Sequence, residues 1–359
     1  MKILKRILKV LLALIAILVL CFAGLIIYAL ASDYKPAASD LLAVPDNPAT
    51  LKDSLEINLL TWNIGYAGLD KDMDFFKDGG TKVITPKNRC LENISGICDF
   101  LKKNDSIDFF LIQEIDRKSK RSYRIDEYER ISKVLPAYHP FFAKNYDVFF
   151  VPVPPSQPMG KVLSGLATFS KYIPENSTRY SLPGDFGFPT QLFYLDRCFM
   201  VNRYKLVNGK ELVLINTHNE AFDESGEIRK AQMEKLKEYV LNEYVSGNYV
   251  IIGGDWNQYP PDLKPSFAHD KSFTGKVGNF NLRGIEATYM PAEWKWIFDP
   301  STPSVRTDMA AYQASVTPTS ICDIFLVSPN IKSLGVKGCD LGFTFSDHNP
   351  VIVKVKLGQ

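Results

Sequence analysis

The feature that most constrains this chain is an uninterrupted apolar run near its amino terminus. Residues 10–31, VLLALIAILVLCFAGLIIYALA, are 22 residues without a charge, and as a helix they would span about 33 Å. The hydrocarbon core of a bilayer is about 30 Å thick. We therefore expect residues 10–31 to form a transmembrane anchor, with the rest of the chain folded as a body on one side of the membrane.

The charges that flank this run predict its orientation. Four cations and no acid precede it, at positions 2, 5, 6 and 9. The positive-inside rule keeps this end in the cytoplasm and places everything after about Asp33 outside. We thus expect a single-pass protein of the cell membrane with an extracytoplasmic body. A cleaved signal peptide is the alternative, because Ala29-Leu30-Ala31 resembles a cleavage site, although apolar regions of signal peptides usually have about 7–15 residues.

The composition is that of a globular protein. Of 359 residues, 46% are hydrophobic and 23% are charged, which excludes a disordered chain, a collagen-like repeat and a small disulfide scaffold. The 42 Lys and Arg, less the four before the apolar run, leave 38 against 40 Asp and Glu. The body is therefore not a general binder of polyanions, and a contact with nucleic acid would need a local basic patch.

Five cysteines follow the apolar run, at positions 90, 98, 198, 322 and 339. Their number is odd, and the sequence has no CxxC motif and no Cys/His cluster, which argues against a zinc site and against a full set of disulfides. We expect all five to be buried apolar residues. A disulfide between Cys322 and Cys339 stays open.

The chain divides into four parts by composition: a basic segment (1–9), the anchor (10–31), a polar, proline-containing linker that lifts the body off the membrane (32–54), and the body (55–357). Helices are predicted after Pro86 and from Glu224 to about Tyr244. Apolar runs predict strands at Leu55–Trp62, Phe109–Gln113, Gly165–Ser170, Arg197–Tyr204, Leu212–Thr217, Tyr249–Gly253, Ile321–Val327 and Pro350–Val355. This mixture indicates an α+β sandwich with loops at one rim.

Polar clusters follow strand after strand. One such residue usually caps a turn, but six clusters in the same setting indicate side chains that meet at one edge of a sheet. They are Asn63 in LLTWNIG, Glu114 in FFLIQEID, His218 and Asn219 in VLINTHNEA, Asp255 and Asn257 in VIIGGDWNQ, Asp323 in ICDIFLV, and Asp347 and His348 in FSDHNP.

The ordered series WNIG, QEID, THNEA, GDWN, CDIFLVS and SDHNP resembles the endonuclease/exonuclease/phosphatase superfamily of metal-dependent phosphoesterases. The resemblance covers roughly residues 55–357, the whole body. It implies a four-layer α/β/β/α sandwich of two packed mixed sheets, and a hydrolase that acts on phosphoric esters.

The resemblance also implies a metal site. Glu114 resembles the principal metal ligand of the family, with Asp347 near the same ion and Asn63 helping to hold both metal and phosphate. Hard oxygen ligands of this kind suit Mg²⁺ or Mn²⁺ rather than zinc.

Four further residues resemble the family's water-activating and proton-transfer groups. Asp255 would orient or deprotonate the attacking water, with Asn257 beside it. His348 would contact the phosphate or transfer a proton, and Asp323 would fix its ring. The sequence leaves open whether Asp255 or His348 is the general base.

Three residues bear on the substrate. His218 matches a second histidine that the deoxyribonuclease and sphingomyelinase branches carry, and it would act on the developing phosphate charge or on the leaving oxygen. Asn219 is expected beside the substrate, although the sphingomyelinase-type THLHA pattern has an apolar residue there. Arg197 is expected to reach a phosphate, with an ion pair to Asp196 or Glu211 as the alternative.

Taken together, these features predict a membrane-anchored, Mg²⁺-dependent phosphoesterase that works outside the cytoplasm. The expected substrate is a lipid head group or a small phosphoester, and an extracytoplasmic nuclease is the alternative. A catalytically inactive binding protein on the same fold is a second alternative, because a fold does not fix function. The expected partners are the phosphoester and the membrane, and no protein partner is implied.

Overall fold

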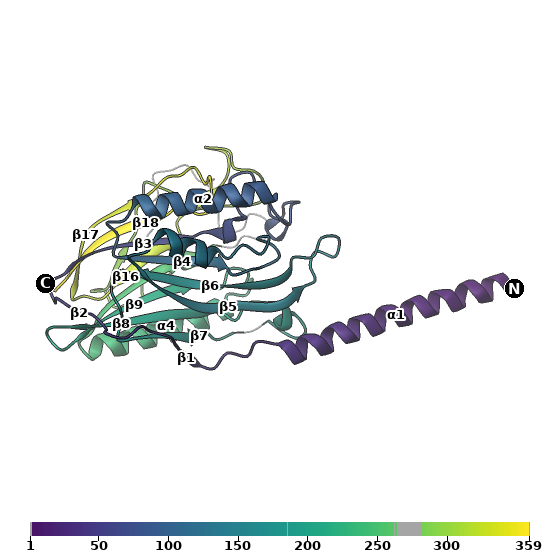
Figure 1. Ribbon diagram of the computed structural model, residues 1–359, viewed down its shortest axis with the longest axis horizontal. Coiled ribbons are helices and arrows are strands. Elements are labelled where there is room, and N and C mark those ends of the chain that lie inside the picture. Colours follow the sequence, from purple (N-terminus) through teal and green to yellow (C-terminus); the bar gives the residue numbers. More distant parts are fainter. Residues whose placement is uncertain (1, 185, 262, 264–281, 359) are drawn as a thin grey trace.

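The body of the protein is built from two β-sheets that lie face to face, and a single long helix projects from it (Figure 1). The computed structural model describes residues 2–184, 186–261, 263 and 282–358. His269, which belongs to none of the sequence motifs, lies outside these residues.

The larger sheet is mixed. Its strands run in the order β1-β7-β8-β9-β10-β16-β13, with β2 paired to β8. The β9/β10 and β2/β8 pairs are parallel and the other pairs are antiparallel. The bounds are β1 (Ser39–Leu42), β2 (Thr50–Leu51), β7 (Asn176–Ser181), β8 (Cys198–Leu206), β9 (Glu211–His218), β10 (Tyr249–Asp255), β13 (Lys295–Ile297) and β16 (Asp323–Val327).

The smaller sheet has the order β17-β18-β3-β4-β6-β5. It is also mixed, because β3 and β4 are parallel and the other neighbours are antiparallel. The bounds are β3 (Glu56–Asn63), β4 (Phe109–Asp116), β5 (His139–Val151), β6 (Gly160–Ser170), β17 (Ile331–Gly338) and β18 (Val351–Leu357).

Short elements fill the loops between these strands. They are the pairs β11 (Gln258–Tyr259) with β12 (Arg283–Gly284) and β14 (Val305–Arg306) with β15 (Thr319–Ser320), and the 3-10 turns η1 (Gly65–Ala67), η2 (Phe76–Asp78) and η3 (Thr190–Phe193).

The core between the sheets comes from alternate residues of the central strands. Leu59 and Leu111 of the smaller sheet pack in one buried cluster with Leu214, Ile251 and Phe325 of the larger. Side chains alternate between the two faces of a strand, so the residues between them point outward, where helices cover them. Both faces of each central strand are thus apolar, which explains the continuous apolar runs in the sequence.

Helices cover both outer faces. The helices α2 (Lys87–Lys103) and α3 (Glu127–Val134) pack on the smaller sheet, and α4 (Glu227–Val245) packs on the larger sheet (Figure 1). The predicted four-layer α/β/β/α sandwich of two mixed sheets is confirmed.

The helix α1 (Lys2–Ser32) stands apart from the body for most of its length. Within the described chain it is the one helix long and apolar enough to cross a membrane, with a mean hydropathy of 3.3. Its last turns rest on the body. Ala29 is buried there, and the ring of Tyr28 meets the ring of Phe149 edge to face at 4.4 Å.

The segment 32–54 corrects a prediction. It was expected to be a linker, but β1 pairs with β7 along four residues and β2 pairs with β8. The reason is that an uncovered edge strand such as β7 offers free backbone groups, which this polar segment satisfies. The segment is therefore part of the folded body.

All eight predicted strands exist, with ends shifted by a few residues. The helix α4 begins at Glu227 rather than Glu224. The helix α3 and the strands β5, β7 and β17 were not predicted. All six cysteines are free thiols, so the open possibility of a Cys322–Cys339 disulfide is not realised. Cys339 is only half-buried.

Candidate active site

Strand register brings three of the predicted residues together in the larger sheet. In the strand β10, Asp255 lies opposite His218 of the parallel neighbour β9 and opposite Asp323 of the antiparallel neighbour β16. All three are buried. Residues far apart in the sequence thus become direct neighbours at one edge of the sheet.

The smaller sheet contributes Asn63 and Glu114 at the same edge. Asn63 ends β3 opposite Gln113 of β4, so Glu114 is the next residue along. The pairing of β4 with β6 is irregular between Ile112 and Ile115, and Glu114 has a positive φ of 50°. Bulges re-aim side chains near active sites, and here the bulge turns the Glu114 carboxylate into the cavity between the loops.

Three side chains converge on the carboxylate oxygen Oδ2 of Asp255. Asn63 donates to it through Nδ2 at 3.0 Å. The Nε2 atom of His218 lies 3.4 Å away and that of His348 lies 3.7 Å away. Burial raises the pKa of Asp255, but the two histidines and the hydrogen bonds from Asn63 and Asn257 outweigh this effect and lower the pKa below its ordinary value. The carboxylate is therefore held in its charged form.

His348 and Asp323 form a close pair. The Nδ1 atom of His348 lies 2.7 Å from Asp323 Oδ2. Burial lowers the pKa of His348, but the charges of Asp323, Asp347 and Asp255 outweigh it and raise that pKa well above its ordinary value. At neutral pH His348 is an imidazolium held in place by Asp323.

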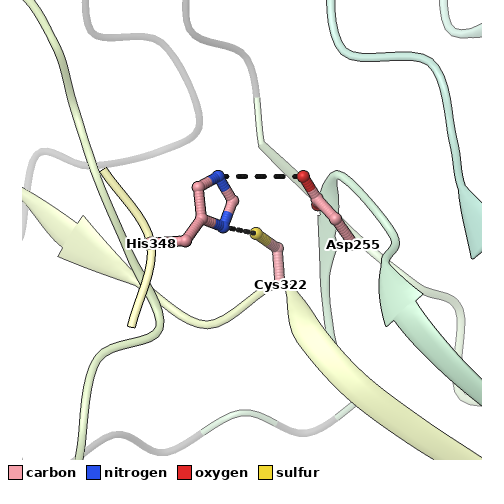
Figure 2. A group of neighbouring side chains, drawn as sticks. All are labelled: Asp255, Cys322 and His348. Carbon is pink, nitrogen blue, oxygen red and sulfur yellow. Dashed lines mark hydrogen bonds and ion pairs between the residues drawn. The ribbon is translucent and has the colours of Figure 1, made fainter. Parts of the chain in front are cut away.

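A cysteine, Cys322, lies against the ring of His348, as Figure 2 shows. Cys322 Sγ is 4.0 Å from His348 Nδ1 and 3.7 Å from Asp323 Oδ2. Ligand atoms of Asp255, Cys322 and His348 all lie within 4.8 Å of one another. Cys322 and His348 are 26 residues apart in the sequence, so only the fold brings them together. Burial raises the pKa of Cys322 well above its usual range, so this cysteine stays a neutral thiol at neutral pH.

The second histidine, His218, differs from His348 in charge. Burial, and next the positive charge of Arg197, lower the pKa of His218 to about 3. Its Nδ1 atom is buried without a hydrogen-bond partner among the described residues. His218 is a neutral imidazole, and the two histidines of the site therefore differ in charge.

The carboxylates of Glu114 and Asp347 both line the cavity. Burial and then the charge of Asp347 raise the pKa of Glu114, which is the expected effect on two acids that face the same space. Asn63 donates to Glu114 Oε1 at 3.2 Å. Gly65 allows the close approach of Asp347, because a Cβ at Gly65 would lie 2.8 Å from Asp347 Oδ1. Two partly buried acids and an amide form an oxygen-rich set that fits a hard divalent cation.

A cavity of about 100 Å³ lies at this edge of the two sheets. Of the predicted site residues it is lined by Asn63, Glu114, Arg197, His218, Asp255, Asn257, Asp347 and His348. Asp323 lies behind His348 rather than in the wall.

Arg197 and Asn219 differ from their predictions in part. Arg197 lines the cavity, but its ion-pair partner is Glu220, at 3.1 Å from Nε, rather than Asp196 or Glu211. Its Nη1 is buried and has no hydrogen-bond partner in the described part of the chain.

Asn219 does not line the cavity. Its side chain accepts from Thr217 Oγ1 and donates to Met233 Sδ, while its carbonyl accepts from Asn257 Nδ2 at 2.9 Å. The side chain of Asn219 is therefore not placed for the predicted substrate contact, and its carbonyl instead holds the side chain of Asn257.

Other residues of the wall were not predicted. Arg121 forms two hydrogen bonds with Asp116, and its guanidinium lies 3.6 Å from the ring centre of Tyr66. Lys77 and Phe222 complete this side of the cavity. These residues come from loops between the motifs, where no apolar run or motif marks them, so no pattern in the sequence could have identified them.

The four-layer sandwich, with this site at one edge of its sheets, is a phosphoesterase fold. A sequence profile described as Endonuclease/Exonuclease/phosphatase family matches residues 60–348, so the chain belongs to this family, whose members hydrolyse phosphoesters and generally use divalent metal ions. No curated protein matches the sequence closely enough to be counted as a relative.

Solved structures show the same fold at low identity. An endonuclease/exonuclease/phosphatase from Beutenbergia cavernae is 16% identical, with a TM-score of 0.55 over 84% of this chain and 72% of that one. Another from Bacteroides vulgatus is also 16% identical, with a TM-score of 0.53 over 84% and 99%. ANGEL2, a 2′,3′-cyclic phosphatase, in complex with adenosine-2′,3′-vanadate, is 13% identical, with a TM-score of 0.53 over 88% and 99%.

Proposed function

We propose that this chain is a membrane-anchored phosphoesterase that depends on Mg²⁺ or Mn²⁺ and works outside the cytoplasm. The observation that carries the proposal is the convergence of Asn63, His218 and His348 on one charged carboxylate, Asp255, beside two further acids. An inactive binding protein would have no need of such a costly buried set of charges.

Glu114 and Asp347 would hold the metal ion, with Asn63 fixing Glu114 through its amide. When bound, such an ion supplies charge stabilisation at a phosphoryl oxygen and at the leaving oxygen. Burial and next the charge of Asp347 raise the pKa of Glu114, so a bound cation would stabilise the charged form of Glu114.

The protonation states favour one assignment of the acid and base roles. Asp255 is held ionised and can accept a proton or a hydrogen bond from the attacking water, and Asn257 fixes it by donating its backbone N–H to Oδ1 at 2.9 Å. His348 is already charged, so it cannot accept a proton and instead donates to the phosphate. We therefore assign the orienting or basic role to Asp255.

His218 and Arg197 form another part of the cavity wall. His218, as a neutral imidazole, can donate to the phosphate or the leaving oxygen. Arg197 is held by Glu220 through Nε, which leaves its buried Nη1 available to a phosphate oxygen. An arginine with a donor left over in a buried wall is typical of an anion-binding role.

The place of action follows from α1. Its length and apolarity suit a membrane span, and the four cations at its start favour a cytoplasmic amino end. A tethered enzyme meets lipid head groups at high local concentration, which favours a lipid or small phosphoester as substrate. A nuclease is the alternative, and the nucleotide bound to ANGEL2 keeps nucleotide esters among the candidates.

The test is a substrate screen with the full chain in detergent. Phospholipids, inositol phosphates, 2′,3′-cyclic nucleotides, and single-stranded and duplex DNA are each incubated with Mg²⁺ or with EDTA. We expect Mg²⁺-dependent release of product from one class, lost in Asp255→Asn and kept in the control Glu293→Gln, which changes an exposed acid. If no ester is hydrolysed, or if Asp255→Asn is as active as wild type, the proposal is wrong.

A further inference from the structure

The end of the membrane helix is fixed to the body rather than joined to it by a free tether. Tyr28 packs on Phe149 and Ala29 is buried. A few residues later, the ring of Tyr34 lies 3.6 Å from Lys144 Nζ, in a cation–π contact.

The chain stays fixed beyond this point. The carbonyl of Ala37 accepts from Ser181 Oγ, and β1 then pairs with β7. Because contacts with the body follow one another from Tyr28 to β1, the orientation of α1 determines which face of the body meets the membrane.

That face carries exposed apolar side chains. The strands β5 and β6 form a hairpin whose tip, 152–159, points to the side from which α1 projects (Figure 1). At this tip Val153 is 43% exposed. Phe188, just before η3, is 64% exposed. Both β5 and η3 contact α1. Lys120, which donates to the carbonyl of Pro158 in the hairpin, adds an exposed cation there.

The catalytic cavity lies next to this face. Its wall includes Met159 from the hairpin and Leu195 and Arg197 from the chain after η3. The same Leu195 and Arg197 also line a groove formed with residues 33–36, directly after α1. Leu195 and Arg197 therefore line both the catalytic cavity and the groove beside the end of α1.

We propose that Val153 and Phe188 are a second membrane contact, which seats in the bilayer surface beside α1 and holds the catalytic cavity at the head-group layer. This inference rests on the proposed anchoring of the chain by α1. The occupant is a lipid surface, because Val153 and Phe188 adjoin β5 and η3, which both contact α1, and because exposed apolar side chains flanked by a cation suit the boundary between head groups and acyl chains.

The test places tryptophan probes in the full chain, in lipid nanodiscs that contain brominated acyl chains. The variants are Phe188→Trp, Val153→Trp and the control Val207→Trp. Val207 is also 64% exposed, but it follows the far end of β8, about 30 Å from Cys198 by strand rise. The wild type gives the background of the native tryptophans. We expect brominated lipid to reduce the added emission of the probes at 153 and 188 by about twofold, and to leave the probe at 207 unchanged.

The result that would overturn the inference is equal emission from all three probes in brominated and ordinary lipid. Shielding of Phe188 by a second copy of the chain, seen as a dimer in one nanodisc without quenching, would overturn it equally. The measurement needs no turnover. If the protein hydrolyses no ester yet shows the quenching, the proposed function is wrong and the membrane contact stands. If the chain does not stay in the nanodisc, the proposed anchoring by α1 is wrong, and the membrane contact with it.

An activity comparison adds an independent readout. The double variant Val153→Ser with Phe188→Ser changes no residue of the cavity wall. If an ester of the active class can be offered both in vesicles and as a short-chain soluble analogue, we expect about tenfold slower hydrolysis in vesicles and an unchanged rate on the soluble form. If the double variant hydrolyses both forms as fast as wild type does, the membrane contact is contradicted.

Discussion

At the scale of single residues, the candidate site holds two histidines in different charge states, one charged and one neutral. Both lie near Asp255, yet His348 is paired with Asp323, while His218 faces Arg197 and has a buried nitrogen without a partner. The same residue type therefore serves as a fixed cation in one place and as a neutral donor in the other.

Replacing Asp323 by Asn should remove the main charge that raises the pKa of His348. We expect that pKa to fall by about one unit or more, and kcat to fall more than KM rises, because the ring loses its partner while the phosphate contacts remain. Histidine NMR titration of the metal-free protein measures the first effect and steady-state kinetics the second. An unchanged His348 pKa would show that Asp323 has no electrostatic role.

The sequence predicted most of these residues but not their states. The motif residues at strand ends could be identified because each follows an apolar run. The charge of His348 and the neutrality of His218 depend on burial and on neighbours distant in the sequence, such as Arg197 and Asp323. Arg121 and Lys77 belong to loops without a pattern, so only the folded chain places them at the cavity.

At the scale of elements, an ion-pair cluster joins α4 to the larger sheet. Arg203 of β8 donates to Glu243 of α4 through both terminal nitrogens and to Glu211 of β9 through Nε. Asn248, after the helix, also donates to Glu243. This cluster fixes the end of α4 and with it the strand β10 that carries Asp255.

We expect Glu243→Gln to destabilise the protein by about 1–2 kcal/mol at pH 7. Burial raises the pKa of Glu243, but Arg203 and Asn248 outweigh it and lower the pKa below its ordinary value. The charged form therefore contributes stability above the ordinary pKa of Glu, and this contribution disappears as the pH falls through the lowered value. Thermal unfolding in detergent, from pH 7 down to pH 3, measures the difference between wild type and variant.

Glu238→Gln, on an exposed position of the same helix, is the matched control and should change little at any pH. A loss for Glu243→Gln that stays constant down to pH 3 would contradict the ionic origin of the effect.

Elements with long apolar runs were predicted well, and others were missed for physical reasons. The strand β5 mixes buried with half-buried residues, so its apolar content is diluted. The strand β1 at the edge of the sheet has only four residues, and its neighbour β7 is polar, so their pairing is a backbone interaction that leaves no side-chain pattern. The supposed linker was misjudged for the same reason.

At the scale of the whole molecule, the claim is that the body lies outside the cytoplasm. A protease added to intact cells, or to spheroplasts if an outer membrane is present, should digest the body and spare the short amino-terminal segment. By the positive-inside rule, the four amino-terminal cations are expected to keep that end in the cytoplasm. A body that resists until the membrane is opened would reverse the orientation, and a mature protein that begins at Ser32 and washes off would show cleavage instead of anchoring.

The most direct test of the central claim is the metal dependence of Glu114→Gln. The substitution keeps the size of the side chain and removes its charge, so the full chain in detergent should lose its Mg²⁺-dependent turnover of the substrate found in the screen, by about a thousandfold. Calorimetric titration with Mn²⁺ should show weaker binding than in wild type, while thermal unfolding shows an intact fold. If Glu114→Gln binds the ion and turns over substrate as wild type does, the carboxylate at the bulge of β4 is not the metal ligand and the account of this site is wrong.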